Sequence, residues 1–430
     1  MIAAVAAARA RCDELREAGR ELARRPIAAI VESLERACAR WREPDGAERS
    51  SAESALALHY GVPERAIAVV LDAAFERWDA AAMKAWIDSE LGSMAALDRP
   101  VAIGEARRMA IGPELVVALS ARGVPTTPLV DIVASLLVKA PIWLKPATGS
   151  DDLVERFART LSEVDPLLGS AVETASWTSR SAVGQTVLEA AEVVVATGRD
   201  ETMTVLRRAV DPGARLVIHG PRLSAALIGR GDLTRDREGV LAALADDVAF
   251  AGQSGCLSPV VAWIEAPPPE LAALIEPLHA ALVERWPGPP RSEAEPRERA
   301  RFAEWLALAS VEREAKVAGP IAGGFESSWS VQARTRAQPP DPPPVPRLLF
   351  LAPLEEVGVA AELCARRRGT VATLGIALDP SRAEPIAPSL ARAGVERIAP
   401  LGSMQRPPLA WRRDGRPTLA DLVRWFDREG

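Results

Sequence analysis

The run AGQSGCLSP at residues 251–259 has the residue types of a nucleophilic site. Its cysteine, Cys256, lies in a predicted loop between a helical pattern at 236–250 and the apolar run VVAWIE at 260–265. Small neighbours let a substrate carbonyl approach the sulfur closely, and nucleophiles are commonly carried by loops between rigid elements. A lone cysteine is by default a small buried apolar residue, but the glycine, glutamine and serine neighbours favour a nucleophile at Cys256.

The other three cysteines have different surroundings. Cys12, Cys38 and Cys364 lie among apolar positions of helical patterns, and we predict that they pack in the interior. The four cysteines form no pair with the spacing of a metal or redox motif. The sequence therefore predicts one reactive thiol.

The histidines offer little chemistry of their own. His59, His219 and His279 are scattered and no HExxH motif occurs, so metal catalysis is not expected. A thiol hydrolase would need a histidine base, and His219, at the end of the strand-like run RLVIH, is the one candidate. A structural role is at least as good an interpretation of His219, and spacing alone does not decide between the two.

Composition and charge narrow the class of protein. A length of 430 residues indicates two or three domains, and 48% hydrophobic with 26% charged residues is ordinary globular composition. A net charge of −6 argues against nucleic-acid binding. The most apolar stretch, 128–144, is crossed by Asp131 and Lys139, so no membrane span is expected. Residues 1–40 lack the apolar core of a signal peptide, and we expect a cytoplasmic protein.

Alternating helical and strand-like patterns after Pro113 predict a doubly wound, parallel α/β organisation behind a helical N-terminal region. Neither a P-loop motif nor the glycine-rich dinucleotide fingerprint is present. The Pro-rich stretches 286–296 and 338–346 are expected to be linkers or surface loops. We predict helices over 2–40 with a break at Pro26, and over 52–60, 63–91, 128–138, 150–162, 236–250, 355–367, 381–393 and 418–428, and strands at 141–145, 170–175, 192–197, 215–219, 260–265, 347–351 and 370–376.

Several segments, taken in order, resemble the acyl-CoA reductase branch, the LuxC-type fatty-acid reductases, of the aldehyde dehydrogenase superfamily. They are LKPATGSDD at 144–152, AAEVVVATGRDETM at 190–203, RLVIHGPRLSAALI at 215–228, AGQSGCLSP at 251–259 and the closing segment 394–425. The resemblance covers roughly residues 100–430. It implies two doubly wound α/β lobes: a helical region at 1–100, a cofactor domain at 101–215, a thiol domain at 216–395, and a C-terminal segment at 396–430 that packs back on them.

The resemblance also assigns roles to residues. Cys256 matches the catalytic thiol, and Lys145, one of only four lysines, matches the residue that holds the adenosine ribose. Thr148 stands where NAD-preferring members place an acid, so that a 2′-phosphate would not be repelled and NADPH is favoured. The turn that faces the cofactor pyrophosphate is matched by Thr197, Gly198 and Arg199.

The implied reaction is attack of the Cys256 thiolate on an acyl-CoA or acyl-protein thioester, followed by reduction to an aldehyde. Where oxidising relatives carry a Glu that activates water, this chain has Ile218 to Pro221. The family's oxyanion Asn is missing near 122–125, which leaves the backbone N–H of Cys256 as one oxyanion donor.

Two alternatives follow from these departures. One is a weakly active or non-catalytic relative that binds an acyl-protein or a partner subunit, and the other is an NAD(P)-dependent aldehyde-oxidising dehydrogenase. The resemblance further implies a homo-oligomer and, as a partner, an acyl-protein synthetase.

Overall fold

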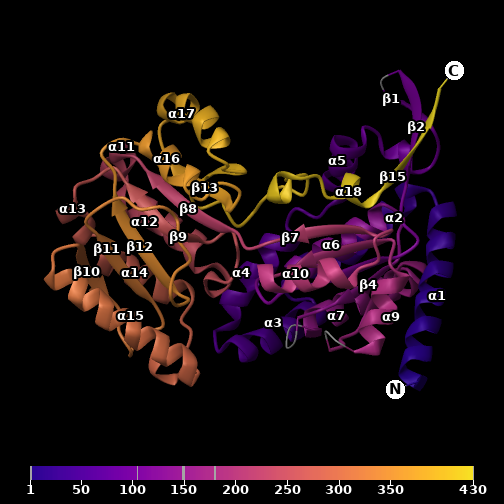
Figure 1. Cartoon of the computed structure of the whole chain (residues 1–430), viewed down its shortest axis with the longest axis horizontal. Coiled ribbons are helices and arrows are strands. Elements are labelled where there is room, and N and C mark those ends of the chain that lie inside the picture. Colours follow the sequence, from indigo (N-terminus) through magenta and orange to yellow (C-terminus); the bar gives the residue numbers. More distant parts are fainter. Residues whose placement is uncertain (1, 104, 148–150, 179–180, 430) are drawn as a thin grey trace. The chain divides into compact units, whose positions relative to one another are not determined.

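The computed structural model describes residues 2–103, 105–147, 151–178 and 181–429. The chain divides into two compact units (Figure 1). The first unit comprises Met1–Glu53, Leu71–Pro221 and Pro408–Gly430, and the second comprises Ser54–Val70 and Arg222–Pro407. Each unit has its own largely parallel sheet with helices between the strands, which confirms the predicted α/β class.

The first unit is built on a parallel sheet with the strand order β5-β4-β3-β6-β7. The chain winds outward from β3 through β4 to β5, then returns to β6 beside β3 and continues to β7. The winding direction therefore changes between β3 and β6, which is where α/β sheets bind ligands, at the carboxyl ends of the strands. The strands are β3 (Val116–Leu119), β4 (Ile142–Lys145), β5 (Val172–Thr174), β6 (Val193–Thr197) and β7 (Arg215–His219).

The strands at the centre of this sheet bury every residue except the last. The pattern follows from sequence, since β6 reads Val-Val-Val-Ala-Thr and β-branched residues suit a sheet that is covered on both faces. Leu119, Lys145 and Thr197 end their strands partly exposed. Register places Leu119 beside Lys145 on one side, and Thr197 beside His219 on the other. Polar side chains of the first unit thus gather at the carboxyl edge of its sheet.

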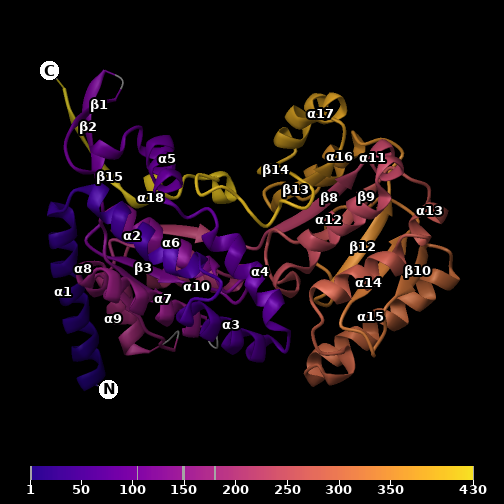
Figure 2. The same ribbon diagram turned by 180° about the vertical axis from the view of Figure 1, so that it is seen from behind.

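Helices cover this sheet on both sides. One face packs apolar residues of β3 and β6 against α1, α9 and α10, and α1 runs along the outside of the unit against α8 and α9 (Figures 1 and 2). The break predicted at Pro26 separates α1 from α2. The helices are α1 (Ile2–Arg24), α2 (Ile27–Arg42), α5 (Ala80–Leu91), α6 (Thr127–Leu137), α7 (Asp151–Val164), α8 (Pro166–Ser170), α9 (Ala182–Ala190), α10 (Asp200–Ala209) and α18 (Leu419–Leu422), with 3₁₀ turns η1 (Met94–Leu97) and η4 (Arg413–Gly415).

A separate antiparallel sheet of the first unit corrects one prediction. The helix predicted over 418–428 is wrong, because only α18 is helical and the chain continues as strand β15 (Arg424–Arg428). β15 pairs along β2 (Ala106–Ile111), which also pairs with β1 (Val101–Ile103). Pairing with β2 and the aromatic pair Trp425-Phe426 favour a strand over the helical pattern.

The second unit has a larger sheet with the order β10-β11-β12-β9-β8-β13-β14, parallel except where β10 meets β11. Its strands are β8 (Leu223–Ile228), β9 (Pro259–Ile264), β10 (Ala318–Ala322), β11 (Ser330–Arg334), β12 (Leu348–Pro353), β13 (Val371–Ala377) and β14 (Arg397–Pro400). Its helices are α11 (Arg230–Arg235), α12 (Arg237–Ala249), α13 (Pro268–Ala272), α14 (Ile275–Arg285), α15 (Pro296–Glu314), α16 (Val359–Ala365) and α17 (Pro380–Arg392), with 3₁₀ turns η2 (Phe250–Gln253) and η3 (Arg291–Glu293).

The helix predicted after residue 62 also differs from the structure. The helix predicted over 63–91 is two helices, α4 (Glu64–Phe75) and α5, because Asp79 caps α5 by accepting from the Ala82 N–H at 2.7 Å. The other member of that predicted pair is α3 (Ala47–Tyr60). Both Pro-rich stretches are loops of the second unit, joined by the buried Arg291.

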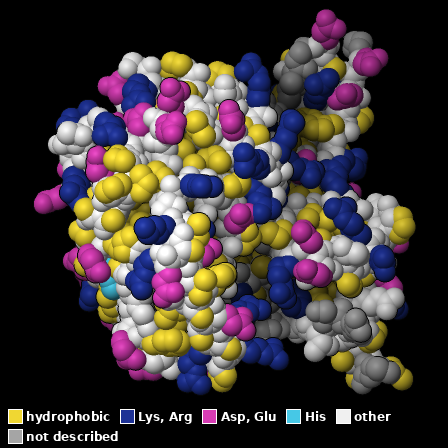
Figure 3. Space-filling model, turned by 60° about the vertical axis from the view of Figure 1, so that its left-hand side comes forward, with side chains coloured by type: hydrophobic (Ala, Val, Ile, Leu, Met, Phe, Trp, Pro, Cys, Tyr) yellow, Lys and Arg dark blue, Asp and Glu magenta, His cyan; other side chains and the backbone are white. Residues whose placement is uncertain are grey.

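The surface carries both signs of charge. On the face in Figure 3, Lys and Arg side chains alternate with Asp and Glu over the whole view. Among the described residues, no helix is both long and apolar enough to cross a membrane.

Candidate active site

Cys256 is an exposed thiol in the loop between η2 and β9 of the second unit. The other cysteines, Cys12, Cys38 and Cys364, are free and buried, as predicted. Burial raises the pKa of Cys38 and of Cys364 to about 12. Solvent therefore reaches the thiol of Cys256, and the buried thiols are held in the unreactive protonated form.

The loop before Cys256 has an unusual backbone. Ala251, Gly252 and Gln253 are consecutive residues in the left-handed region, with φ of 48°, 64° and 63°. A Cβ on Gly252 would stand 2.9 Å from Nε1 of Trp286, so glycine is required there for space as well as for conformation. Such a backbone persists only where its surroundings hold it in place, and such sites are often functional.

The side-chain amide of Gln253 supplies part of that support. Its Nε2 donates to the carbonyl oxygens of Pro259 and Leu348, both at 3.0 Å, and its Oε1 accepts from the Leu348 N–H at 3.0 Å. Gln253 thereby bonds to the first residues of β9 and β12 in the way a strand backbone would. The thiol loop is tied to the sheet at its amino edge.

A second set of polar contacts holds the loop from the other side. The hydroxyl of Ser224, fully buried at the start of β8, donates to the Cys256 carbonyl at 2.7 Å. Nε2 of Gln405 donates to the Asp247 carbonyl at 2.6 Å and to the Ser258 hydroxyl at 3.3 Å. The backbone of Cys256 is thus fixed while its thiol stays exposed.

Asp247, at the end of α12, connects this set to the segment after β14. Its carboxyl oxygens accept from the N–H groups of Gly402, at 2.5 Å, and Met404, at 2.9 Å. Burial raises the pKa of Asp247 to about 7, and these two hydrogen bonds oppose the shift. The carboxyl of Asp247 therefore changes charge near neutral pH.

Lys145 ends β4 at the carboxyl edge of the first unit's sheet. Its Nζ lies 6.0 Å from the ring centroid of Trp177, and partial burial lowers its pKa. Within the described residues, no carboxylate lies within ion-pair distance of this ammonium group. The group is available to hold an anion or a ribose hydroxyl. Thr148, the other predicted residue of this motif, lies outside the described residues.

Thr197, Gly198 and Arg199 form the turn from β6 into α10, as the resemblance implies. A Cβ on Gly198 would come within 2.9 Å of the Met203 methyl group, so this glycine allows the turn to pack closely on α10. Arg199 occupies the N-cap position of α10 without a side-chain capping bond. The first turn of α10 carries Asp200 and Glu201, whose negative charge opposes an anion at this helix N-terminus.

A polar cluster that sequence reasoning missed lies beside this turn. The Nδ1 of His219, at the end of β7, is 2.6 Å from Oδ2 of Asp414, and both side chains are almost fully buried. Nη2 of Arg413 donates to the Thr197 hydroxyl at 3.2 Å. Burial raises the pKa of Asp131 on α6, and the positive charge of Arg413 opposes that shift.

The structure therefore divides the predicted residues between its units. Lys145, Thr197, Gly198 and Arg199 belong to the first unit, and Cys256 belongs to the second. The side chain of His219 is paired with that of Asp414, and this contact favours a structural role for the histidine. The contacts that support the Cys256 loop come from far along the chain. Ser224 donates to the Cys256 carbonyl and Gln405 to the Ser258 hydroxyl, and no local spacing signals either contact.

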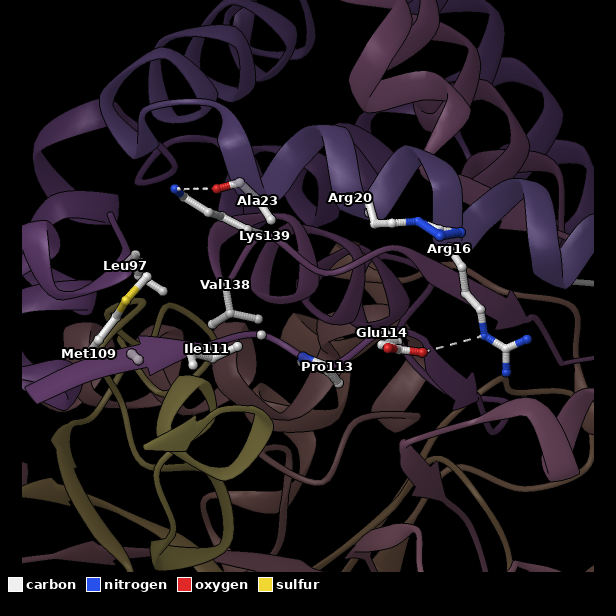
Figure 4. Close-up of a pocket in the computed structure, with 13 residues that line it drawn as sticks. Arg16, Arg20, Ala23, Leu97, Met109, Ile111, Pro113, Glu114, Val138 and Lys139 are labelled. Carbon is white, nitrogen blue, oxygen red and sulfur yellow. Dashed lines mark hydrogen bonds and ion pairs between the residues drawn. The ribbon is translucent and has the colours of Figure 1, made fainter. Parts of the chain in front are cut away.

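Two cavities lie at the opposite, amino edge of the first unit's sheet. The smaller one, of about 190 Å³, is lined by residues that precede β3 and β4, and in Figure 4 Lys139 points toward the Ala23 carbonyl and Arg16 toward Glu114. The other, of about 600 Å³, is lined by residues that precede β6 and β7, including Glu192 and Ala214. Ligands of α/β sheets bind at the carboxyl ends of the strands, so both cavities lie away from the edge at which the sequence predicts the cofactor.

The fold is that of aldehyde dehydrogenases. An acetylating aldehyde dehydrogenase from Geobacillus thermoglucosidasius aligns over 100% of this chain and 97% of its own, with a TM-score of 0.69 and 14% identity. A NAD-dependent benzaldehyde dehydrogenase from Corynebacterium glutamicum aligns over 99% and 90%, with a TM-score of 0.65 and 16% identity. An NADP-dependent glyceraldehyde-3-phosphate dehydrogenase from Bacillus halodurans aligns over 97% of this chain and 90% of its own, with a TM-score of 0.69 and 14% identity.

A family model for acyl-CoA reductases (LuxC) matches residues 22–425. The chain belongs to this family, as the ordered segments predicted, and is an oxidoreductase. Among curated proteins, none matches. In the part of the chain that the structure describes, no group of His, Cys, Asp and Glu side chains could hold a metal ion.

Proposed function

We propose that the protein reduces an acyl-CoA or acyl-protein thioester to an aldehyde with NADPH, through an acyl group carried on Cys256. The observation that carries the proposal is the exposed Cys256 thiol on a loop fixed by Ser224 and Gln253, in a chain of the acyl-CoA reductase family. A nucleophile needs solvent access and a fixed backbone at once, and this loop provides both.

The first half of the reaction uses residues of the second unit. The thiolate of Cys256 attacks the thioester carbon, a new C–S bond forms, and the C–S bond to the leaving thiol breaks. CoA or the carrier thiol departs as a thiolate and takes up a proton from water. The acyl group is then held as a thioester of Cys256. Ser224 keeps the main chain of Cys256 in place through both events.

The second half requires a reduced nicotinamide, which supplies a hydride to the acyl carbon. The carboxyl edge of the first unit fits a dinucleotide, because Lys145 is a half-buried cation with no carboxylate beside it among the described residues and Thr197 adds a hydroxyl. After the hydride has arrived, the bond between the acyl carbon and the sulfur of Cys256 breaks, the aldehyde leaves, and the thiolate is restored.

Two sequence features favour reduction over oxidation and NADPH over NADH. The stretch Ile218 to Pro221 stands where oxidising relatives carry a Glu, so no carboxylate in that stretch would activate water to hydrolyse the acyl-enzyme. Thr148 carries no negative charge that would repel the 2′-phosphate of NADPH.

We also propose that the protein is a homo-oligomer and that an acyl-protein synthetase could deliver its substrate. Strand β15 forms one edge of its sheet, and Trp425 and Phe426 on it are 40% and 47% exposed. Replacing Phe426 with Asp is expected to shift the protein to a smaller species in size-exclusion chromatography.

The test is a panel of acyl-CoAs with purified protein and NADPH, in which aldehyde formation and NADPH consumption are measured together. We expect equal amounts of both, and loss of both in Cys256→Ser. Oxidation of free aldehyde with NAD(P)⁺ in place of acyl-CoA reduction would favour the dehydrogenase alternative. Binding of an acyl-protein with no turnover of any substrate would favour the non-catalytic alternative.

A further inference from the structure

The last part of the first unit is a strap, residues 408–423, that crosses from the edge of the sheet to strand β15. The strap is held at its far end by Glu90 on α5, whose carboxylate accepts from three successive N–H groups, at 2.6 to 3.1 Å. Arg215 on β7 donates to the carbonyl oxygens of Asp421, at 2.7 Å, and Val423, at 2.8 Å. Such charge-assisted bonds to consecutive backbone groups fix the path of the strap.

At its near end the strap is fixed by a buried pair of polar side chains, His219 and Asp414. Asp414 lies in the left-handed region with φ of 57°, and its carboxylate faces Nδ1 of His219 at 2.6 Å. The side chains of His219 and Asp414 are 9% and 5% exposed. A buried pair of this kind in a strained turn defines the direction of the neighbouring side chain, which is that of Arg413.

Arg413 is directed to the carboxyl end of β6. Its guanidinium donates to the Thr197 hydroxyl at 3.2 Å, and over the described ranges it makes no ion pair with a carboxylate. Burial raises the pKa of the Asp131 carboxyl, and the charge of Arg413 opposes that shift. Arg413 therefore brings a positive charge to the strand end at which Asp200 and Glu201 make the N-terminus of α10 unfavourable for anions.

We propose that Arg413 is a phosphate-binding residue at the carboxyl edge of the first unit, and that the His219–Asp414 pair is its positioning device. The inference rests on the proposed function, which brings two organic phosphates to the protein: NADPH and CoA. Guanidinium groups bind phosphate oxygens in a planar, bidentate way, and Thr197 would orient the guanidinium. The positive charge that binds the phosphate then comes from Arg413 on the strap, and not from the N-terminus of α10 alone.

The test compares Arg413→Gln with Arg412→Gln, a matched control that removes the same charge from an exposed neighbour. NADPH and CoA are titrated separately against each full-length protein by calorimetry. We expect Arg413→Gln to weaken one of the two ligands by about 10- to 100-fold, the effect of one lost charge-assisted hydrogen bond. The weakened ligand identifies the source of the phosphate. Arg412→Gln should bind both ligands as the wild type does, and the difference should shrink at 1 M NaCl, where the Debye length is about 3 Å.

Equal binding of both ligands by wild type and Arg413→Gln would overturn the inference while leaving the proposed function intact. A wild-type protein that binds neither ligand would overturn both.

The positioning role has its own comparison. In Asp414→Ala the pair with His219 is lost, and we expect the same ligand to bind about 10-fold more weakly. Asp414→Asn keeps a hydrogen-bonding group and tolerates the left-handed backbone, so it should recover most of the affinity. Circular dichroism and thermal unfolding check that each variant is folded. If Asp414→Ala is folded and binds both ligands normally, the His219–Asp414 pair does not position Arg413.

Discussion

The residues proposed to act in the reaction lie at the carboxyl edge of the first unit's sheet and at the amino edge of the second unit's sheet. In the first unit, Lys145, Thr197 and His219 end parallel strands, so the carboxyl edge is polar as a direct result of topology. In the second unit, Cys256 precedes β9 and therefore lies at the amino edge, where topology gives no such help. There the loop is held by side chains, chiefly Gln253, Ser224 and Gln405. Strand ends alone can make a polar edge, whereas an exposed loop at the amino edge requires side chains that hold its backbone.

The largest expected effect contrasts Cys256 with the buried thiols. With iodoacetamide at pH 8, Cys256 should be alkylated at least about 1,000-fold faster than Cys38 or Cys364 in the native protein, because burial keeps those two protonated. Peptide mass spectrometry measures the modification at each site. Comparable labelling of all four cysteines without denaturant would contradict the exposed loop.

The next effect tests the amide that ties the loop to the sheet. Gln253→Glu keeps the shape of the side chain but replaces two N–H donors with an oxygen that faces the carbonyls of Pro259 and Leu348. We expect the free energy of unfolding to fall by about 3 kcal/mol. Urea titration measures this free energy. The control is Gln185→Glu on the exposed surface of α9, where we expect a loss of only about 0.2 to 0.5 kcal/mol. An equal loss of unfolding free energy in the two variants would show that the amide of Gln253 does not hold the loop.

A pH effect is expected from Asp247, whose pKa in the folded state, about 7, is above the ordinary value of an aspartate. The folded state binds the proton more tightly, so this group stabilises the fold below about pH 4 and the contribution is lost as pH rises to 7. Relative to Asp247→Asn, the wild type should lose on the order of 4 kcal/mol of unfolding free energy between pH 4 and 7.5. A difference between the two proteins that is constant over this range would show that Asp247 does not titrate there.

The smallest effect concerns the hydroxyl that holds the Cys256 carbonyl. Ser224→Ala should lower the free energy of unfolding by about 1 kcal/mol and change the alkylation rate of Cys256 by about fivefold. Ser330→Ala removes another buried hydroxyl of the same sheet, one that donates to the Gly323 carbonyl, and should leave that rate unchanged. The same alkylation rate in both variants would mean that Ser224 does not set the geometry of the thiol loop.

Much of the fold could be predicted because its signals are local. Runs such as Val193–Thr197 are strands on composition alone, and Pro26 marks the break between two helices. Strand β8 was not among the predicted elements, since its Leu-Ser-Ala-Ala-Leu-Ile sequence has little strand preference and is fixed by burial between β9 and β13. β15 was missed for a related reason, because its partner β2 is remote in sequence.

The candidate site likewise contains residues that local sequence identifies and residues that only the folded chain reveals. Cys256 and Lys145 could be singled out from neighbouring residue types and from their ordered motifs. Ser224, Asp414 and Arg413 act through partners at separations of 32, 195 and 216 residues, and only the folded chain brings those partners within hydrogen-bond distance. No window of sequence contains that information.

We propose above all that Cys256 carries the acyl group between the two halves of the reaction. Intact-mass spectrometry of the protein mixed with an acyl-CoA in the absence of NADPH tests it directly, with Cys256→Ser alongside. We predict a mass increase equal to one acyl group that maps to Cys256, is lost when NADPH is added as aldehyde forms, and is absent in Cys256→Ser. Aldehyde formation by the Cys256→Ser protein, or an acyl group found on another residue, would contradict the account.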